Sequence, residues 1–241
     1  MTRIFVDDVL AAGSERDLPD DAAHHLAQVL RARAGDALVL FDGRGGEYEA
    51  EILLAERRRV RVRITAHRAV DRESKLELRL AQCVSKGERM DYTLQKAVEL
   101  GVAQLVPLLS ARSVVKLDAE RWDKKLEHWR GVIVSACEQS GRTRVPSLAP
   151  VQKLEHWLAA SDDGDLRLIL APGAGATLRT LPAASRISLL VGPEGGFSDD
   201  EIALAQRHGF VALGLGPRVL RTETAGVAAL AALQALHGDL G

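Results

Sequence analysis

Two glycine-rich turns, each lying between a short apolar run and a helix signal, constrain this chain more than any other feature. The first run, residues 187–191, is apolar apart from one serine and is ended by Gly192 and Pro193. This length and this ending are typical of a buried strand. Ser198, with Glu201 three residues later, forms a capping-box pattern for a following helix. The pattern predicts a strand that enters a helix through a loop of nearly bare backbone.

The second turn repeats this scheme. Residues 210–215 form another apolar run, followed by Gly216 and Pro217. Thr222 is the predicted cap of the next helix, and Glu223 falls in its positively polarised first turn. Two such loops on neighbouring strands predict one crevice at the carboxyl ends of the strands, where exposed amides suit a nucleoside or an anion.

Composition narrows the class of protein. The 241 residues are 46% hydrophobic, and 32 Lys and Arg stand against 33 Asp and Glu. A nucleic-acid partner would therefore need a local basic patch rather than a global field. Cys83 and Cys137 are isolated, which disfavours a disulfide framework or a zinc site, and no other metal-ligand cluster is present. With no signal peptide and no long apolar stretch, we expect a soluble cytoplasmic protein without membrane contact.

Residues 1–72 are predicted to form a small β-rich domain with one helix near residues 20–30. Strands are expected at residues 4–6, 37–41, 48–54 and 59–64. In the last of these, strict alternation places Arg59, Arg61 and Arg63 on one face and apolar residues on the other. We call these three residues the arginine ridge. It is either a phosphate-tracking RNA surface or a solvated face neutralised by glutamates of the preceding strand.

Other basic residues are candidates for RNA contact. They lie in the N-terminal domain, in the turn after its helix and beside the strand ends of the second domain: Arg3, His24, Arg31, Lys86, Arg112 and Arg142. Solvated loop charge is the alternative for each of them, and neither histidine of the His24-His25 pair has partners at metal-ligand spacing.

Residues 73–241 show strands that alternate with helices. Strands are expected at 76–84, 104–108, 166–170, 187–191 and 210–215, and helices at 90–101, 122–137, from 154, after 198 and at 225–236. This order predicts an α/β domain with a mostly parallel sheet and helices on both sides. The last helix is apolar nearly all round, which predicts burial on every side. A second copy of the chain would supply the missing surface, so we expect a homodimer; burial within the monomer is the alternative.

The motifs together resemble a known family. KGERMDYTLQKAVELGV, SACEQSGR, VGPEGGFSDDEI and LGPRVLRTETA follow, in this order, an N-terminal domain that carries HHLAQVLR. In this the chain is similar to the RsmE-type 16S rRNA (uracil-N3)-methyltransferases of the SPOUT superfamily. The resemblance implies a PUA-like β-barrel for RNA, a methyltransferase domain with a trefoil knot, a homodimer, and methyl transfer from S-adenosylmethionine to a uridine in the decoding region of the small ribosomal subunit.

The resemblance also implies the site. The cofactor is expected in loops after three strands, at Leu170, Gly192, Glu194, Gly196, Leu213, Gly214, Leu215, Gly216, Val219, Leu220 and Thr222. Glycines there leave main-chain groups free to bind the cofactor, and ordinary turn chemistry is the alternative.

Methylation at uracil N3 requires removal of a proton and stabilisation of the charge left on the base. Arg221 is the expected electrostatic stabiliser, and Glu223 and Glu194 are the candidate bases. An ion pair for Arg221, a helix-dipole role for Glu223, and catalysis by positioning without any base are the alternatives.

Two competing functions remain at this point. One is methylation of another RNA, tRNA or 23S rRNA, at a ribose 2′-oxygen. The other is a non-catalytic RNA-binding assembly protein whose glycine loops are only turns. A phosphate-binding NTPase is disfavoured because GPEGGF lacks the lysine and hydroxyl residue of a P-loop.

Overall fold

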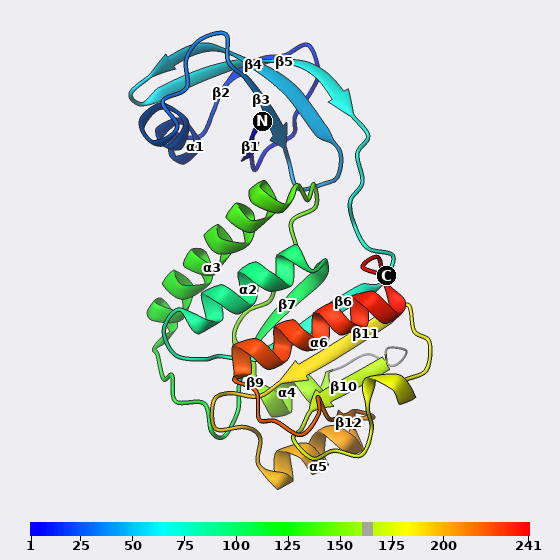
Figure 1. Cartoon of the computed structure of the whole chain (residues 1–241). Coiled ribbons are helices and arrows are strands. Elements are labelled where there is room, and N and C mark those ends of the chain that lie inside the picture. The colour runs from blue at the N-terminus through cyan, green and yellow to red at the C-terminus, as the bar shows by residue number, and fades with distance from the viewer. Residues whose placement is uncertain (161–165) are drawn as a thin grey trace. The chain divides into compact units, whose positions relative to one another are not determined.

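The computed structural model describes residues 1–160 and 166–241 (Figure 1). Its contacts divide the chain into two compact units. The first consists of residues 1–73 and 137–145, and the second of residues 74–136 and 146–241. Residues 137–145, which the sequence grouped with the second domain, are thus packed with the first.

The first unit is built on a five-stranded sheet in the order β1-β3-β4-β5-β2. Its strands are β1 (Thr2–Phe5), β2 (Glu15–Asp17), β3 (Ala37–Phe41), β4 (Glu47–Glu56) and β5 (Arg59–Arg68), and its helical elements are α1 (Asp20–His24) and a π-helical turn, η1 (His25–Val29). The predicted alternation in β5 is confirmed, because Val60, Val62 and Ile64 are fully buried in the core of this unit. The sequence did not predict β2, which pairs antiparallel with β5.

The second unit contains a seven-stranded sheet with the path β12-β10-β11-β6-β7-β8, and β9 pairs with β7. All described pairings in it are parallel. The strands are β6 (Glu77–Cys83), β7 (Val102–Leu109), β8 (Ser147–Leu148), β9 (Gln152–Lys153), β10 (Leu166–Leu170), β11 (Arg186–Val191) and β12 (Val211–Leu213). The predicted mostly parallel sheet is therefore confirmed.

Helices cover both faces of this sheet, as predicted (Figure 1). They are α2 (Arg89–Glu99), α3 (Ala119–Ser140), α4 (Leu154–Ala159), α5 (Asp199–Arg207) and α6 (Thr222–His237), with a 3-10 turn, η2 (Leu178–Thr180). Trp157 of α4 and Ala205 of α5 belong to one apolar cluster with Ala81, Ile169 and Leu190 of the sheet. Helix α6 contacts α2, β6 and β11.

Helix α6 buries only one side within a single chain. Leu230 and Leu233 are fully buried, whereas Ala228, Ala235 and Leu236 are exposed. The alternative that this apolar helix is enclosed by its own chain is therefore wrong for the described residues. An apolar helix face is left open to solvent.

Candidate active site

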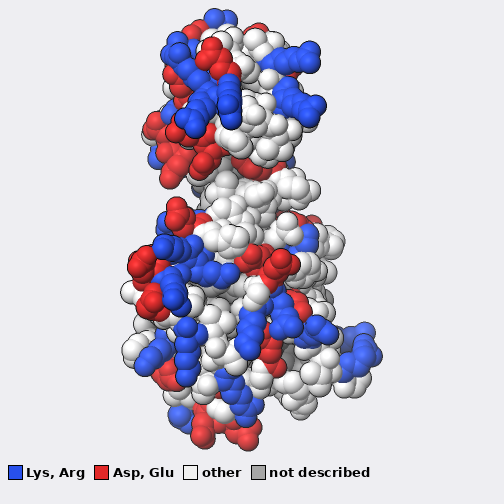
Figure 2. Space-filling model, turned by 90° about the vertical axis from the view of Figure 1, so that its left-hand side faces the viewer, with Lys and Arg blue, Asp and Glu red and all other residues white. Residues whose placement is uncertain are grey.

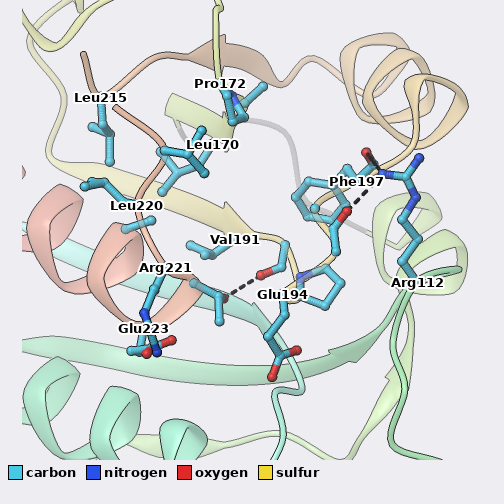
Figure 3. A pocket seen from close by; sticks show the side chains of 18 of the residues that line it. Arg112, Leu170, Pro172, Val191, Glu194, Phe197, Leu215, Leu220, Arg221 and Glu223 are labelled. Carbon is cyan, nitrogen blue, oxygen red and sulfur yellow. Dashed lines mark hydrogen bonds between the residues drawn. The ribbon is translucent and has the colours of Figure 1, made fainter. Parts of the chain in front are cut away.

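A pocket of 670 Å³ opens at the carboxyl ends of β10, β11 and β12 (Figure 3). Its walls come from the loop after β10, the loop that joins β11 to α5, and the segment between β12 and α6. This is the place that the two glycine-rich turns predicted, since loops at the carboxyl edge of a parallel sheet converge on one crevice.

Two sets of hydrogen bonds stabilise the loop after β11. Ser198 accepts a hydrogen bond from the Glu201 amide at 3.2 Å, and the Glu201 carboxylate accepts one from the Ser198 amide at 2.9 Å, which confirms the predicted capping box. The Arg112 guanidinium donates to the carbonyl oxygens of Gly195 at 2.9 Å and Phe197 at 3.3 Å (Figure 3). These bonds fix the backbone that forms one wall of the pocket.

The chain beyond β12 passes between two parts of the segment that follows β10. The Leu213 carbonyl accepts from the Ala171 amide at 3.1 Å on one side, and the Gly214 amide donates to the Ala176 carbonyl at 3.0 Å on the other. A Cβ at Gly214 would lie 2.9 Å from the Ala174 carbonyl oxygen. Only glycine fits this passage, which is the kind of close approach that a threaded fold requires.

Thr222 does not cap α6, contrary to the prediction. Arg221 is the N-cap residue without a side-chain bond, and Thr222 is the first residue of the helix. The Thr222 hydroxyl instead donates to the Gly192 carbonyl at 2.6 Å and accepts from the Gln82 side-chain amide at 2.9 Å. Because Gln82 is buried at the end of β6, this network joins the start of α6 to β6 and to the loop after β11.

Replacing Thr222 with valine should therefore destabilise the fold. The change removes two hydrogen bonds, the one that Thr222 accepts from the buried Gln82 side-chain amide and the one that it donates to the Gly192 carbonyl, although Gln82 still donates to the Cys83 carbonyl. At about 0.5–1.5 kcal/mol for each bond, the free energy of unfolding should fall by about 1–3 kcal/mol. We expect thermal unfolding to shift down by about 2–4 °C for each kcal/mol lost. Thr224→Val, at an exposed position in the same turn, is the control and should leave the transition unchanged. Equal melting curves for the two variants would contradict the role of the network.

Two pocket carboxylates are bridged by one arginine. Glu194 Oε1 accepts from Arg89 Nη1 at 2.8 Å and from the Lys86 amide at 2.9 Å. Arg89 Nε lies 3.8 Å from Glu223 Oε1. Burial raises the pKa of Glu194, but the hydrogen bonds from Lys86 and Arg89 outweigh it and hold that pKa below its usual value. Glu194 is thus a stably ionised group.

Glu223 differs from Glu194 in its second oxygen. Its Oε2 is buried and has no hydrogen-bond partner within the described chain. The side chain lines the pocket and is 15% exposed. An unpaired buried carboxylate oxygen is costly, so this position is suited to accept a hydrogen bond or a proton from a bound molecule.

Arg221 and Arg218 bring positive charge to the same pocket. Both are exposed, and neither forms an ion pair with any described residue. In Figure 3 the side chains of Arg221 and Glu223 extend from the start of α6, away from the apolar side chains of Leu170, Pro172 and Leu215. The pocket therefore has an apolar end and a charged end.

Most of the predicted cofactor and catalytic residues line this one pocket. All expected cofactor residues line the pocket except Gly214, which is not among the lining residues. The three catalytic candidates also line the pocket. The sequence assigned no role to Gln82 and Phe197, and it offered for Arg89, in the turn with Lys86, a contact to RNA phosphates or solvated loop charge rather than a place in the pocket. Pairing of Arg89 with carboxylates more than a hundred residues away leaves no local signal.

The RNA candidates are scattered, and several are engaged. Arg3 is bonded to Glu47 at 2.5 Å, and Arg142 is 4% exposed and paired with Glu73, so both serve the interior of the first unit. Arg112 holds the pocket loop, as described above. Lys86, His24 and Arg31 are exposed.

The arginine ridge is largely neutralised. Asp17 of β2 pairs with both Arg59 and Arg61, and Glu15 pairs with Arg63. The ion pairs support the alternative of a neutralised face, but they come from β2 rather than from the glutamates of β4. Figure 2 shows that acidic and basic side chains are mixed over the face of the molecule that it draws.

Other classes of site find no support in the described residues. Residues 1–160 and 166–241 contain no group of three or more potential metal ligands. Cys83 and Cys137 are unpaired and buried, and burial raises the pKa of each thiol to about 12. No helix in the described part of the chain has the length and apolar character needed to cross a membrane.

Comparison with known proteins places these features in a family. Residues 72–234 match the family described as RNA methyltransferase domain, and residues 18–65 match RNA methyltransferase PUA domain. Ribosomal RNA small subunit methyltransferase E is 31% identical over 98% of this chain and 94% of its own in Buchnera aphidicola (from Acyrthosiphon pisum), and 31% identical over 91% of each chain in Bacillus subtilis.

Two solved structures extend this likeness to the whole fold. A methyltransferase of Legionella pneumophila in complex with the cofactor SAM has a TM-score of 0.96 and 44% identity over 99% of both chains. Ribosomal RNA small subunit methyltransferase E of Neisseria gonorrhoeae, bound to S-adenosyl methionine, has a TM-score of 0.94 and 40% identity over 100% of both chains. The chain therefore belongs to the family of ribosomal RNA small subunit methyltransferases E.

Proposed function

We propose that this protein transfers a methyl group from S-adenosylmethionine to N3 of a uridine in the decoding region of 16S rRNA. The observation that carries the proposal is the pocket at the strand ends, in which an apolar end, bare backbone loops and an unpartnered carboxylate oxygen meet. The names of the relatives and the two cofactor-bound neighbours support it. In this proposal residues 1–72 form the RNA-binding domain and residues 73–241 the catalytic domain, in the cytoplasm.

The residues present fit the cofactor. The volume of 670 Å³ lies within the range of small-molecule sites, and the lining combines apolar side chains with free main-chain groups. Leu170, Leu213 and Leu215 would face an adenine, and the loop at Gly192–Gly196 would offer hydrogen bonds to polar groups. When bound, the cofactor would supply an electrophilic methyl group to uracil N3, and a group of the protein or the solvent would have to accept the N3 proton.

The charged end of the pocket would act on the uracil. Loss of the N3 proton spreads negative charge over O2 and O4, and preorganised donors aimed at such charge are the largest aid to catalysis. Arg221 is unpaired, and it lies beside the positively polarised start of α6. We assign it the stabilisation of this charge.

Glu223 is the better of the two candidate bases. Arg89 and the Lys86 amide lower the pKa of Glu194, and a carboxylate of lower pKa is a weaker base. Glu223 keeps one buried oxygen free for the N3 proton. In this scheme Arg89 orients Glu223, and Glu194 holds Arg89.

The open face of α6 supports a homodimer. Val227, Ala228, Ala231, Ala235 and Leu236 form an exposed or half-buried apolar surface on this helix. A second copy is the simplest cover for such a surface, because a two-fold contact is self-complementary. Light scattering at micromolar concentration should give twice the mass of one chain, and the mass of a monomer would contradict the proposal.

The function can be tested directly. Purified protein, S-adenosylmethionine and small ribosomal subunits that lack the modification should give methyl incorporation into 16S rRNA. Nucleoside mass analysis should find 3-methyluridine as the product. Methyl on ribose, or on tRNA or 23S rRNA only, would refute the substrate assignment. Absence of cofactor binding by calorimetry would indicate a non-catalytic protein.

A further inference from the structure

A short segment of the first unit combines exposed apolar side chains with basic ones. Residues 24–33, which we call the basic turn, comprise the end of α1, η1 and the following turn. Val29 is 61% exposed and Leu30 is 45% exposed, and they are followed by exposed Arg31 and Arg33. Large apolar side chains at this exposure have no role in the core of the unit. Their presence beside two arginines indicates a contact surface.

The backbone of the basic turn has two unusual conformations, a π-helical turn and a positive φ at Arg31. Residues 25–29 form a π-helix, which is rare and often found at functional sites. Arg31 has φ 54°, and it is the only non-glycine residue with positive φ in the described ranges. Such a conformation costs about 1–3 kcal/mol and persists only where the surroundings enforce it. Buried Leu26 and the bond from the Ala32 amide to the Leu26 carbonyl, at 3.0 Å, anchor the turn.

The arginines of the basic turn are free to bind an anion. Neither Arg31 nor Arg33 has a side-chain ion pair with a described residue, and no acidic residue occurs from Ala22 to Gly35. Two carboxylates that approach the turn are engaged by backbone amides. Asp36 accepts from the Arg33 amide at 2.7 Å, and Glu138 accepts from the Phe5 amide at 2.9 Å.

The arginine ridge has fewer features of an RNA-binding surface than the basic turn. Each of its three arginines is ion-paired with a carboxylate of β2, whereas neither arginine of the basic turn has a side-chain ion pair with a described residue. The ridge also shows no exposed apolar residue, since the apolar side chains of β5 are buried in the core. The basic turn carries two unpaired arginines, two histidines and two exposed aliphatic side chains, while Asp20 and Asp21 lie at the opposite end of α1.

We propose that the basic turn, rather than the arginine ridge, is the surface with which the first unit binds the RNA substrate. The proposal rests on the proposed function for the identity of the partner as RNA. Arg31 and Arg33 bind phosphates, and Val29 and Leu30 pack against bases or riboses that are unstacked in an irregular RNA. A surface that bound RNA by charge alone would need only the arginines and not the exposed Val29 and Leu30.

Two variants of equal charge separate the basic turn from the ridge. Arg31→Gly with Arg33→Gln removes two charges and relieves the strain at φ 54°, so it should fold at least as well as the wild type. Arg61→Gln with Arg63→Gln removes two charges from the ridge, whose exposed ion pairs contribute little to stability. Fluorescence anisotropy with labelled 16S rRNA fragments, at several salt concentrations, gives Kd and its salt dependence for each.

The basic-turn variant should bind RNA at least tenfold more weakly, and the slope of log Kd against log salt should fall by about 1.4, at about 0.7 per single-strand phosphate contact. The ridge variant should stay within about threefold of wild type. Val29→Ser with Leu30→Ser should weaken binding with an unchanged slope, because it removes no charge. A larger loss in the ridge variant than in the basic-turn variant would overturn the proposal.

Methylation kinetics make the failure of each proposal distinguishable. The basic-turn variants should raise KM for small subunits and leave the Kd for S-adenosylmethionine unchanged. If they bind RNA like wild type and lose only activity on intact subunits, the turn contacts a ribosomal protein and the proposal is wrong. If the wild type transfers no methyl group to subunits, the proposed function fails, and the anisotropy series still decides which surface binds RNA.

Discussion

Replacing Arg221 with alanine is expected to lower kcat by about 10²–10³-fold, the usual cost of removing one preorganised donor from a developing charge. The Kd for S-adenosylmethionine should stay within about threefold of wild type, since Arg221 lies at the charged end of the pocket and not among its apolar side chains. Methyl-transfer assays on small subunits measure kcat, and calorimetry measures the Kd for the cofactor. Arg221 is exposed and has no ion pair in the described chain, so its loss should not destabilise the fold.

The matched control is Arg218→Ala. Arg218 lines the same pocket from the same segment and is likewise exposed, and its replacement removes the same charge. If general positive potential were enough, the two variants would lose activity alike. A loss confined to Arg221 indicates a directed contact. Unchanged kcat in Arg221→Ala would remove this residue from the catalytic assignment and favour catalysis by positioning alone.

Five of the seven described strands of the second unit could be predicted because their signals are local, whereas the two-residue strands β8 and β9 were not predicted. Apolar runs of strand length, ended by glycine, and helices with an apolar stripe fix the order of elements without reference to distant residues. The crevice followed from the same signals, since loops after neighbouring parallel strands must meet. Strand β2 could not be predicted, because Glu15, Arg16 and Asp17 carry no apolar pattern. It exists through pairing with β5, some 45 residues away.

Roles within the site depend on contacts that no local pattern contains. Thr222 resembles a helix cap in sequence, yet its hydroxyl is used by Gly192, thirty residues earlier. Arg142 resembles a loop charge, yet it is buried against Glu73. In both cases the residue type indicated a polar role, but the sequence did not indicate which residue is the partner. The charge balance of the arginine ridge was likewise hidden, because Glu15 and Asp17 reach it from an unpredicted strand.

The role of Gly214 also depends on a contact that no local pattern contains. The sequence grouped this glycine with the cofactor loops, whereas the structure places it in the passage between Ala171 and Ala176. No positive φ is required there. Its importance comes from the 2.9 Å that would separate a Cβ from the Ala174 carbonyl oxygen, a distance that real Cβ atoms essentially never show.

Gly214→Ala should therefore lower the free energy of unfolding by about 1–3 kcal/mol, the usual cost of overpacking. The obstacle is backbone, which cannot rotate away as a side chain would, so the strand end must shift. Leu213 and Leu215 line the pocket on either side of Gly214, and their displacement should weaken S-adenosylmethionine binding about tenfold or more. Denaturant unfolding and calorimetry with the cofactor measure the two effects.

Gly175→Ala is the control for Gly214→Ala. Gly175 lies in the same passage, but a Cβ there meets nothing within 4 Å. Alanine at position 175 should leave stability and cofactor affinity unchanged, or raise stability slightly by restricting the unfolded chain. If both variants behaved like wild type, the passage would have room for a methyl group, and the threaded segment would not be held as closely as its two hydrogen bonds indicate. A defect confined to Gly214→Ala would tie the formation of the cofactor pocket to the threading of the chain.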